Sequence, residues 1–306
     1  MLLALATALP SLFWQGPPDT AAALRAANIR DISVPASSAG EWRKLGFNVI
    51  APPPADCIRL QAPKVNYRPN VARATSAPWV DENAWRYLRN PNAAYCVEAQ
   101  GNAAALATAE AWTWGANAFI VADEAGARAW SDITAFLKSL PEVNLPPRVN
   151  VGFIDDGSPV TGEVMNLLVR RNILFRVIAA PDSALDLNVK PSWNEGPNAG
   201  NPDPSRAAFA IRQQLGDDRR LLRIYGSEVV IGRVFGNRDR ARLVVLNYGA
   251  RPVEAPRVRL LGRFTGIDLH AHGVPAAAAR DIATDANATE FTIPLLQDCA
   301  VVDLRR

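Results

Sequence analysis

Acidic side chains at the ends of predicted strands are the residues of this chain best suited to chemistry. Five of them follow three successive strand-like runs: Glu98, Asp123, Glu124, Asp155 and Asp156. Hydrolysis of a glycosidic bond needs one carboxylic acid to protonate the leaving oxygen and one carboxylate as nucleophile or base. We therefore predict Glu98 and Asp155 as a catalytic pair, with Asp123 as a further catalytic candidate. Asp156 and Glu124 are predicted to contact the substrate.

A structural role is the competing interpretation of the same carboxylates. Asp123, Asp155 and Asp156 each precede a predicted helix, where aspartate commonly caps exposed backbone N–H groups. Glu98 is a poorer cap, and its structural alternative is a solvated or salt-bridged side chain. Glu110 lies midway along a predicted helix, and we expect it to be structural.

Three tryptophans offer a second kind of binding group. Trp14, Trp79 and Trp193 fall at a strand end or in predicted loops, where flat amphipathic rings suit stacking on sugars. We assign them as candidate substrate-binding residues. Loop aromatics also commonly anchor loops to the body of a domain, so both interpretations stay open. The other tryptophans fall on predicted helices at spacings typical of the core.

The histidines and cysteines argue against several other chemistries. His270 and His272 are the only histidines, and both fall in the predicted C-terminal β-rich region. This disfavours a Ser-His-Asp triad and a His-ligated zinc site. The three cysteines lie far apart without metal-ligand spacing, so we predict neither a disulfide framework nor a zinc site. With no glycine-rich phosphate loop either, we expect no metal and no cofactor.

Composition and charge describe an ordinary globular chain of 306 residues with a net charge of +3. The arginines are scattered among the acids, which disfavours nucleic acid as a partner. The opening MLLALATALPSLFW resembles a secretory apolar region with a small-residue cleavage site, but it lacks the charged start. Residues 1–10 are therefore either an export segment or a buried lead-in. No other stretch reaches the roughly 20 apolar residues of a membrane span.

Eight short apolar runs alternate with helical periodicity over residues 11–216, which predicts a (β/α)₈ barrel, complete or degenerate. The runs are 12–14, 31–35, 48–51, 71–75, 94–98, 118–122, 149–155 and 175–179. In such barrels the site lies at the carboxyl ends of the strands. An alternative stays open, in which residues 149–182 form a separate flavodoxin-like piece beside a barrel of six units. The long stretch 181–202 is predicted to be a loop.

Helix boundaries are marked by capping residues. Ser158-Pro159 and Asp203-Pro204 each combine a capping side chain with a proline in the first turn. Asp81-Glu82 is expected at the start of another helix, where acids interact favourably with the helix dipole. Gly115 is expected to end the helix before it. The sequence predicts helices at 19–27, 37–45 and 102–114 and another that buries Trp130, Ile133, Phe136, Leu137 and Leu140. Two more are predicted to begin at Ser158-Pro159 and at Asp203-Pro204.

After Gly216 the residue pattern changes to short runs of alternating apolar and polar residues, separated by Gly, Asn and Asp. We predict an antiparallel β-sandwich over residues 217–306. Its strands are expected at 221–224, 228–234, 241–246, 258–262, 290–293 and 300–304. The fold class is thus α/β with an all-β C-terminal part.

The order of these parts resembles that of bacterial barrel glycoside hydrolases with a C-terminal β-sandwich, including β-galactosidases with an amidotransferase-like middle module. The resemblance is carried by Ala77-Pro-Trp-Val-Asp-Glu-Asn-Ala-Trp-Arg86, by Ala109-Glu-Ala-Trp-Thr-Trp-Gly-Ala-Asn-Ala-Phe119 and by the sandwich ending. In the main clan of these enzymes an Asn-Glu pair ends strand four and a Glu ends strand seven. This chain has Thr75-Ser76 and Asp155-Asp156 at those places.

The resemblance implies a protein that acts on or binds carbohydrate, with a glycoside hydrolase reaction as one hypothesis. The second hypothesis is a non-catalytic carbohydrate-binding or structural protein. Short strand-to-helix loops favour the second, because catalytic barrels normally elaborate these loops to build a pocket. The carboxylates at the strand ends favour the first.

Overall fold

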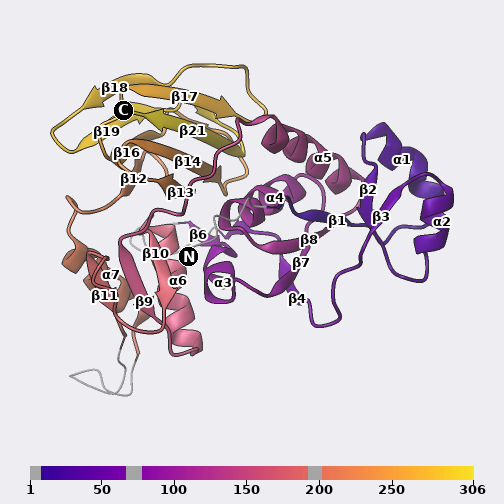
Figure 1. The fold of residues 1–306 in the computed structure, drawn as a ribbon, viewed down its shortest axis with the longest axis horizontal. Coiled ribbons are helices and arrows are strands. Elements are labelled where there is room, and N and C mark those ends of the chain that lie inside the picture. Colours follow the sequence, from indigo (N-terminus) through magenta and orange to yellow (C-terminus); the bar gives the residue numbers. More distant parts are fainter. Residues whose placement is uncertain (1–7, 67–77, 192–201) are drawn as a thin grey trace.

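The computed structural model describes residues 8–66, 78–191 and 202–306. Its first large feature is a six-stranded, all-parallel sheet with the order β3-β2-β1-β8-β7-β4 (Figure 1). The strands are β1 (Ser11–Phe13), β2 (Asp31–Ser33), β3 (Asn48–Ile50), β4 (Ile58–Gln61), β7 (Ala94–Glu98) and β8 (Asn117–Val121). Five of the eight predicted strands lie in this sheet, and β4 was not predicted.

A second parallel sheet holds the predicted seventh and eighth strands. β9 (Val151–Ile154) lies between β10 (Phe175–Ile178) and β11 (Leu187–Val189), in the order β10-β9-β11. A closed eight-stranded barrel is not confirmed for the described residues, because β8 pairs directly with β1 and the predicted seventh and eighth strands lie in a separate sheet. Periodicity predicts strands but not their partners. The flavodoxin-like alternative over residues 149–182 stays a prediction, and the observed sheet extends beyond it to β11.

Some predicted features lie elsewhere or outside the described residues. The predicted strand 71–75 and residues 1–7 of the export or lead-in segment lie outside the described residues. The loop predicted over 181–202 contains β11. The segment before α3 forms an antiparallel pair, β5 (Lys64–Asn66) with β6 (Trp79–Asp81).

The helices are η1 (Pro18–Thr20), α1 (Ala21–Ala26), α2 (Ala39–Lys44), α3 (Ala84–Arg89), α4 (Ala103–Trp114), α5 (Glu124–Ser139), α6 (Pro159–Arg170) and α7 (Pro204–Leu215). Three of the helices, α5, α6 and α7, begin at a capping side chain. Ser158 caps α6 by accepting a hydrogen bond from the N–H of Thr161, and Asp203 caps α7 by accepting one from the N–H of Arg206. Gly115 ends α4 in the left-handed conformation, as predicted. Almost every residue of α4 is buried, which makes it the central helix of the fold. No helix in the described ranges is both long and apolar enough to span a membrane.

The C-terminal part contains two antiparallel sheets, shown in orange and yellow in Figure 1. One has the order β12-β16-β19-β18 and the other β13-β14-β21-β17. Their strands are β12 (Leu222–Tyr225), β13 (Val230–Gly236), β14 (Arg240–Asn247), β16 (Arg257–Leu261), β17 (Gly266–Ala271), β18 (Arg280–Thr284), β19 (Ala288–Thr292) and β21 (Cys299–Arg305), with β15 (Val253–Glu254) and β20 (Leu295–Leu296) as a short extra pair. The predicted antiparallel character of this region is confirmed.

β14 is buried on both faces, and this joins the two parts of the molecule. Leu243 and Val245 belong to the core between the two antiparallel sheets. Val244 and Leu246 belong instead to the larger core, which also contains α4 and α6. Because successive side chains of a strand point to opposite faces, the alternation assigns one face of β14 to each core.

Candidate functional site

Glu98 lies at the carboxyl end of β7, beside the neighbouring strand β4. Its Oε2 accepts a hydrogen bond from Nε2 of Gln61 at 3.4 Å, and its Oε1 lies 3.8 Å from Nη1 of Arg59. The Glu98 side chain is 43% exposed and that of Arg59 is 82% exposed. Since exposed ion pairs contribute little to stability, Glu98 is accessible and only weakly held.

Asp123 follows the next strand, β8, at the same edge of the sheet. Glu98 is in register with Val121, two residues before Asp123. Asp123 accepts hydrogen bonds from the backbone N–H of Gly101 at 2.9 Å and of Gly126 at 2.7 Å. These two bonds lower the pKa of the exposed Asp123 carboxyl. We call Gln61, Glu98 and Asp123, at the ends of β4, β7 and β8, the carboxyl edge.

Asp155 and Asp156 lie in the other parallel sheet, in the loop from β9 to α6. Asp155 forms an ion pair of 2.7 Å with Arg89 of α3 and also accepts a hydrogen bond from the N–H of Gly157 at 3.0 Å. The hydroxyl of Thr161 and the N–H of Ser158 donate to Asp156, and the bond from Thr161 is the main reason why its pKa is lowered. The structure therefore brings Glu98 and Asp123 to one sheet edge and leaves Asp155 on another sheet.

The predicted stacking tryptophans have different surroundings. Trp14 is only 3% exposed, and its Nε1 donates to the hydroxyl of Thr20 at 3.0 Å. Trp79, at the start of β6, is half-buried with the guanidinium carbon of Arg170 4.0 Å from its ring centroid. Trp193 lies outside the described residues. Glu124 is exposed in the first turn of α5.

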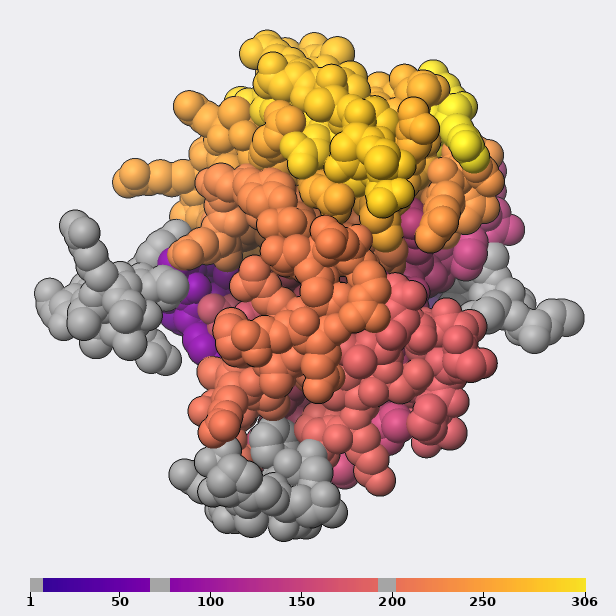
Figure 2. All heavy atoms as spheres, turned by 90° about the vertical axis from the view of Figure 1, so that its left-hand side faces the viewer, coloured from indigo at the N-terminus to yellow at the C-terminus, as the bar shows by residue number. Residues whose placement is uncertain are grey.

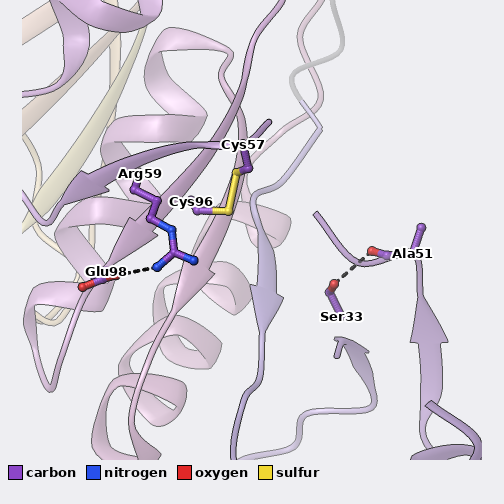
Figure 3. Close-up of a disulfide and its surroundings, with 6 residues drawn as sticks. All are labelled: Ser33, Ala51, Cys57, Arg59, Cys96 and Glu98. Carbon is purple, nitrogen blue, oxygen red and sulfur yellow. Dashed lines mark hydrogen bonds and ion pairs between the residues drawn. A yellow bond between two sulfur atoms is a disulfide. The ribbon is translucent and has the colours of Figure 1, made fainter. Parts of the chain in front are cut away.

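Cys57 and Cys96 form a disulfide with a Cα–Cα distance of 5.9 Å (Figure 3). The prediction that this chain has no disulfide was wrong. The two cysteines meet because β4 pairs with β7 in parallel, with Arg59 opposite Cys96. This pairing joins residues 39 positions apart, and the sequence carries no sign of it. Figure 3 shows the disulfide beside the Arg59–Glu98 ion pair.

A buried pair of carboxyl groups was not predicted as a unit. Glu110 of α4 and Glu82, just before α3, are both completely buried. Oε1 of Glu110 accepts hydrogen bonds from the N–H of Asn83 and from the hydroxyl of Tyr248, both at 2.8 Å. Burial raises the pKa of Glu110 to about 7. Burial, together with the charge of Glu110, also raises the pKa of Glu82.

The sequence contained one usable sign of this pair. Glu110 is the only charged residue of the stretch Ala103–Trp114, which has no polar helix face for it to occupy. The expectation that Glu110 is structural agrees with its burial. Within the described part of the chain, no group of three or more His, Cys, Asp or Glu side chains is arranged to hold a metal ion.

Comparison with known proteins shows which solved structures have a similar fold. No protein-family model matches this chain, and no curated protein matches it. The α-L-fucosidase isoenzyme 2 from Paenibacillus thiaminolyticus aligns over 86% of this chain and 68% of its own, with 11% identity and a TM-score of 0.56. The fold is glycoside hydrolase-like.

Two β-galactosidases give weaker structural matches. One is a GH42 β-galactosidase from G. stearothermophilus, with 8% identity and a TM-score of 0.39, and the other is the β-galactosidase from Rahnella sp. R3, with 10% identity and a TM-score of 0.34. Each alignment covers 97% of this chain and 60% of the enzyme. This chain thus spans about two thirds of the fucosidase and less of the β-galactosidases.

Proposed function

We propose that this protein binds carbohydrate on its glycoside hydrolase-like fold and does not hydrolyse it through the predicted pair Glu98 and Asp155. The proposal rests on one observation above all. Glu98 ends a strand of the six-stranded sheet, whereas Asp155 ends a strand of the three-stranded sheet and is held by Arg89. An acid and a base that act on one glycosidic bond must lie within about 10 Å of each other and face the same substrate.

The pKa values of the carboxyl groups support binding over hydrolysis. A general acid needs a raised pKa so that it holds a proton near neutral pH. The hydrogen bonds to Asp123 and Asp156 act in the opposite direction and keep both ionised. Raised values occur at Glu82 and Glu110, which have no exposed surface to meet a substrate.

The carboxyl edge is the proposed sugar-binding surface. It offers the exposed carboxylate of Glu98 and the amide of Gln61, and such groups accept from and donate to sugar hydroxyls. Asp123 and the exposed Glu124 continue this surface at the start of α5. Trp79 and Asp156, which belong to other parts of the chain, stay secondary candidates for contact.

Glycoside hydrolysis is the second candidate, with Glu98 and Asp123 as its residues. These side chains follow adjacent parallel strands, which lie about 4.8 Å apart. Asp123 lies two residues beyond Val121, the residue paired with Glu98, so the two Cα atoms are further apart than one strand spacing. A glycosidase would need the two carboxyl groups about 5 to 9.5 Å apart. Asp155 would take part only if a substrate bridged the two sheets.

Export from the cytoplasm is also part of the proposal. The disulfide between Cys57 and Cys96 supports it, because disulfides form and persist mainly in oxidising compartments. The apolar opening of the sequence has the character of a secretory segment.

Glycan-array binding followed by turnover assays on each bound glycan tests the proposal. We expect the wild-type protein to bind at least one neutral glycan and to release no product from it. Glu98→Gln should weaken binding by several-fold, whereas Glu142→Gln, an exposed substitution after α5, should not. Product release that falls at least about a hundredfold in Glu98→Gln and Asp123→Asn would favour the hydrolase. Failure to bind any glycan would contradict both.

A further inference from the structure

Arginine side chains gather around a cleft of about 420 Å³ between α6, α7 and the start of the antiparallel sheets. Five of its lining residues are arginines: Arg170, Arg171, Arg212, Arg220 and Arg223. They come from the end of α6, from α7, from the turn after α7 and from β12. Figure 2 looks onto this side of the molecule, where the orange segment of α7 and β12 lies between the yellow sandwich and the salmon segment that includes α6.

The acidic groups near the cleft are too few to neutralise these guanidinium groups. Asp217 is shared by Arg212, Arg220 and Arg223, at 3.8, 3.6 and 3.5 Å. These distances exceed those of good charge-assisted hydrogen bonds, which are about 2.7 to 2.9 Å. Glu228 also lines the cleft. Glu163 and Glu82 also attract Arg170. The five guanidinium groups thus outnumber the four carboxyl groups of the described residues that act on them.

Several of these arginines have hydrogen-bond donors to spare. Nε of Arg220, Nε of Arg223 and Nη1 of Arg170 are buried without a hydrogen-bond acceptor among the described residues. Arg220 is only 8% exposed. Its Nη2 donates to the carbonyl of Arg171 at 2.6 Å, and its Nε has no such acceptor. A buried charged donor without an acceptor lowers the stability of the folded protein. An anion that accepted from these donors would remove that cost.

The guanidinium groups also act on one another. The pKa values of Arg170, Arg171 and Arg220 are lowered, first by burial and then by neighbouring arginines. Arg212 exerts this effect on both Arg171 and Arg220. Mutual repulsion of this kind is relieved when an anion enters the cleft.

We propose that this cleft binds an oxyanion with several acceptor oxygens, such as a sulfate ester, a phosphate ester or the carboxylate of an acidic sugar. Guanidinium groups match such oxyanions with paired hydrogen bonds, and the unmatched Arg170, Arg220 and Arg223 donors show that the local carboxyl groups do not satisfy these arginines. Tyr225, which is 36% exposed, adds a ring and a hydroxyl to the cleft wall. The volume lies in the range of small-molecule sites.

Isothermal titration with sodium sulfate, and then with sulfated, phosphorylated and uronate oligosaccharides, tests the proposal. Maltohexaose serves as the neutral ligand. We expect at least one anionic ligand to bind with one-to-one stoichiometry, and added salt should weaken it. The strongest of the three oligosaccharides identifies the anionic group. Equal or absent binding of all anionic and neutral ligands would overturn the proposal.

Two variants with opposite expected effects keep the test independent of folding. Arg212→Ala combined with Arg223→Ala should lower the affinity at least tenfold, whereas Arg43→Ala, exposed on α2, should leave it unchanged. Asp217→Asn removes the carboxylate that competes for three arginines and should raise the affinity several-fold. If the double variant fails to fold, the affinity of Asp217→Asn for the anionic ligand is the test. An affinity equal to or lower than that of the wild type would overturn the proposal. Loss of neutral-glycan binding alone would affect only the proposed function above.

Discussion

Glu110 shows at the scale of one residue how burial changes the chemistry of a side chain. Its carboxyl lies inside the protein, held by Asn83 and Tyr248, and its pKa is raised to about 7. A raised acid pKa means that the folded protein binds the proton more tightly than the unfolded chain does. Stability from this group is complete below pH 4.5 and is lost as the pH rises to about 7.

The stability of the protein should therefore fall between pH 5 and pH 7, by up to about 1.4 kcal/mol per pH unit for one such proton. Glu110→Gln keeps the acceptor for Tyr248 and should flatten this dependence. The remaining slope would come from Glu82, whose pKa is also raised, with Arg86 as the nearby cation that opposes it. Chemical denaturation at several pH values measures the slope.

The control for this measurement is Glu98→Gln, which changes an exposed carboxyl. It should leave the dependence on pH unchanged. An equal slope in wild type and Glu110→Gln would show that this group does not titrate in the folded protein.

The disulfide is the second residue-scale feature with a measurable effect. Replacing Cys57 and Cys96 by serine should lower the free energy of unfolding by about 4 kcal/mol, because the bond closes a loop of 39 residues in the unfolded chain. Thiol titration of the denatured wild-type protein should find one free thiol, Cys299. Three free thiols, or an unchanged stability after reduction, would contradict the bond.

At the scale of helices and strands, the sequence predicted where helices begin but not which strands pair with each other. Ser158 and Asp203 were recognised as caps because a capping side chain acts within three residues of its own position. The partner of β8 depends instead on which of several similar strands comes to lie beside it, and the sequence suggested a barrel neighbour where the structure has β1. The disulfide could not be predicted for the same reason, because it depends on the pairing of β4 with β7.

Asp123 allows a direct test of whether an acid at a strand end acts mainly as a cap. Asp123→Ala removes the acceptor of two backbone N–H groups and should lower stability by about 0.5 to 2 kcal/mol. Asp123→Asn keeps an acceptor oxygen and should cost much less. Thermal unfolding of the three proteins distinguishes the cases, and equal losses in both variants would argue against capping as the main role.

At the scale of the whole molecule, β14 contributes side chains to both cores, so we expect the antiparallel and parallel parts to unfold together. All eight tryptophans precede residue 217, so their fluorescence reports mainly on the part of the chain before the antiparallel sheets, although Trp114 also lies beside Arg233 of β13. Leu246→Ala, in β14, removes a buried side chain from the shared core and should cost about 2 to 5 kcal/mol. We expect it to lower the tryptophan-detected melting temperature, although the substitution lies in the other part.

Circular dichroism of the same samples gives the second signal. The two melting curves of each protein should coincide, while Ile282→Ala, which alters an exposed side chain of β18, should shift neither. Separate transitions for the two signals would show that the parts unfold independently.

The position of the Cys57–Cys96 bond has a further consequence for self-association. β4 is an end strand of the parallel sheet, and it carries the exposed Ile58. End strands can pair with another chain and start aggregation, and a strand that detaches uncovers the backbone groups of its neighbour. The disulfide fastens β4 to β7, so that the inner strand stays covered. Light scattering at moderate temperature should therefore rise sooner in the reduced protein than in the oxidised one, before the bulk of the chain unfolds.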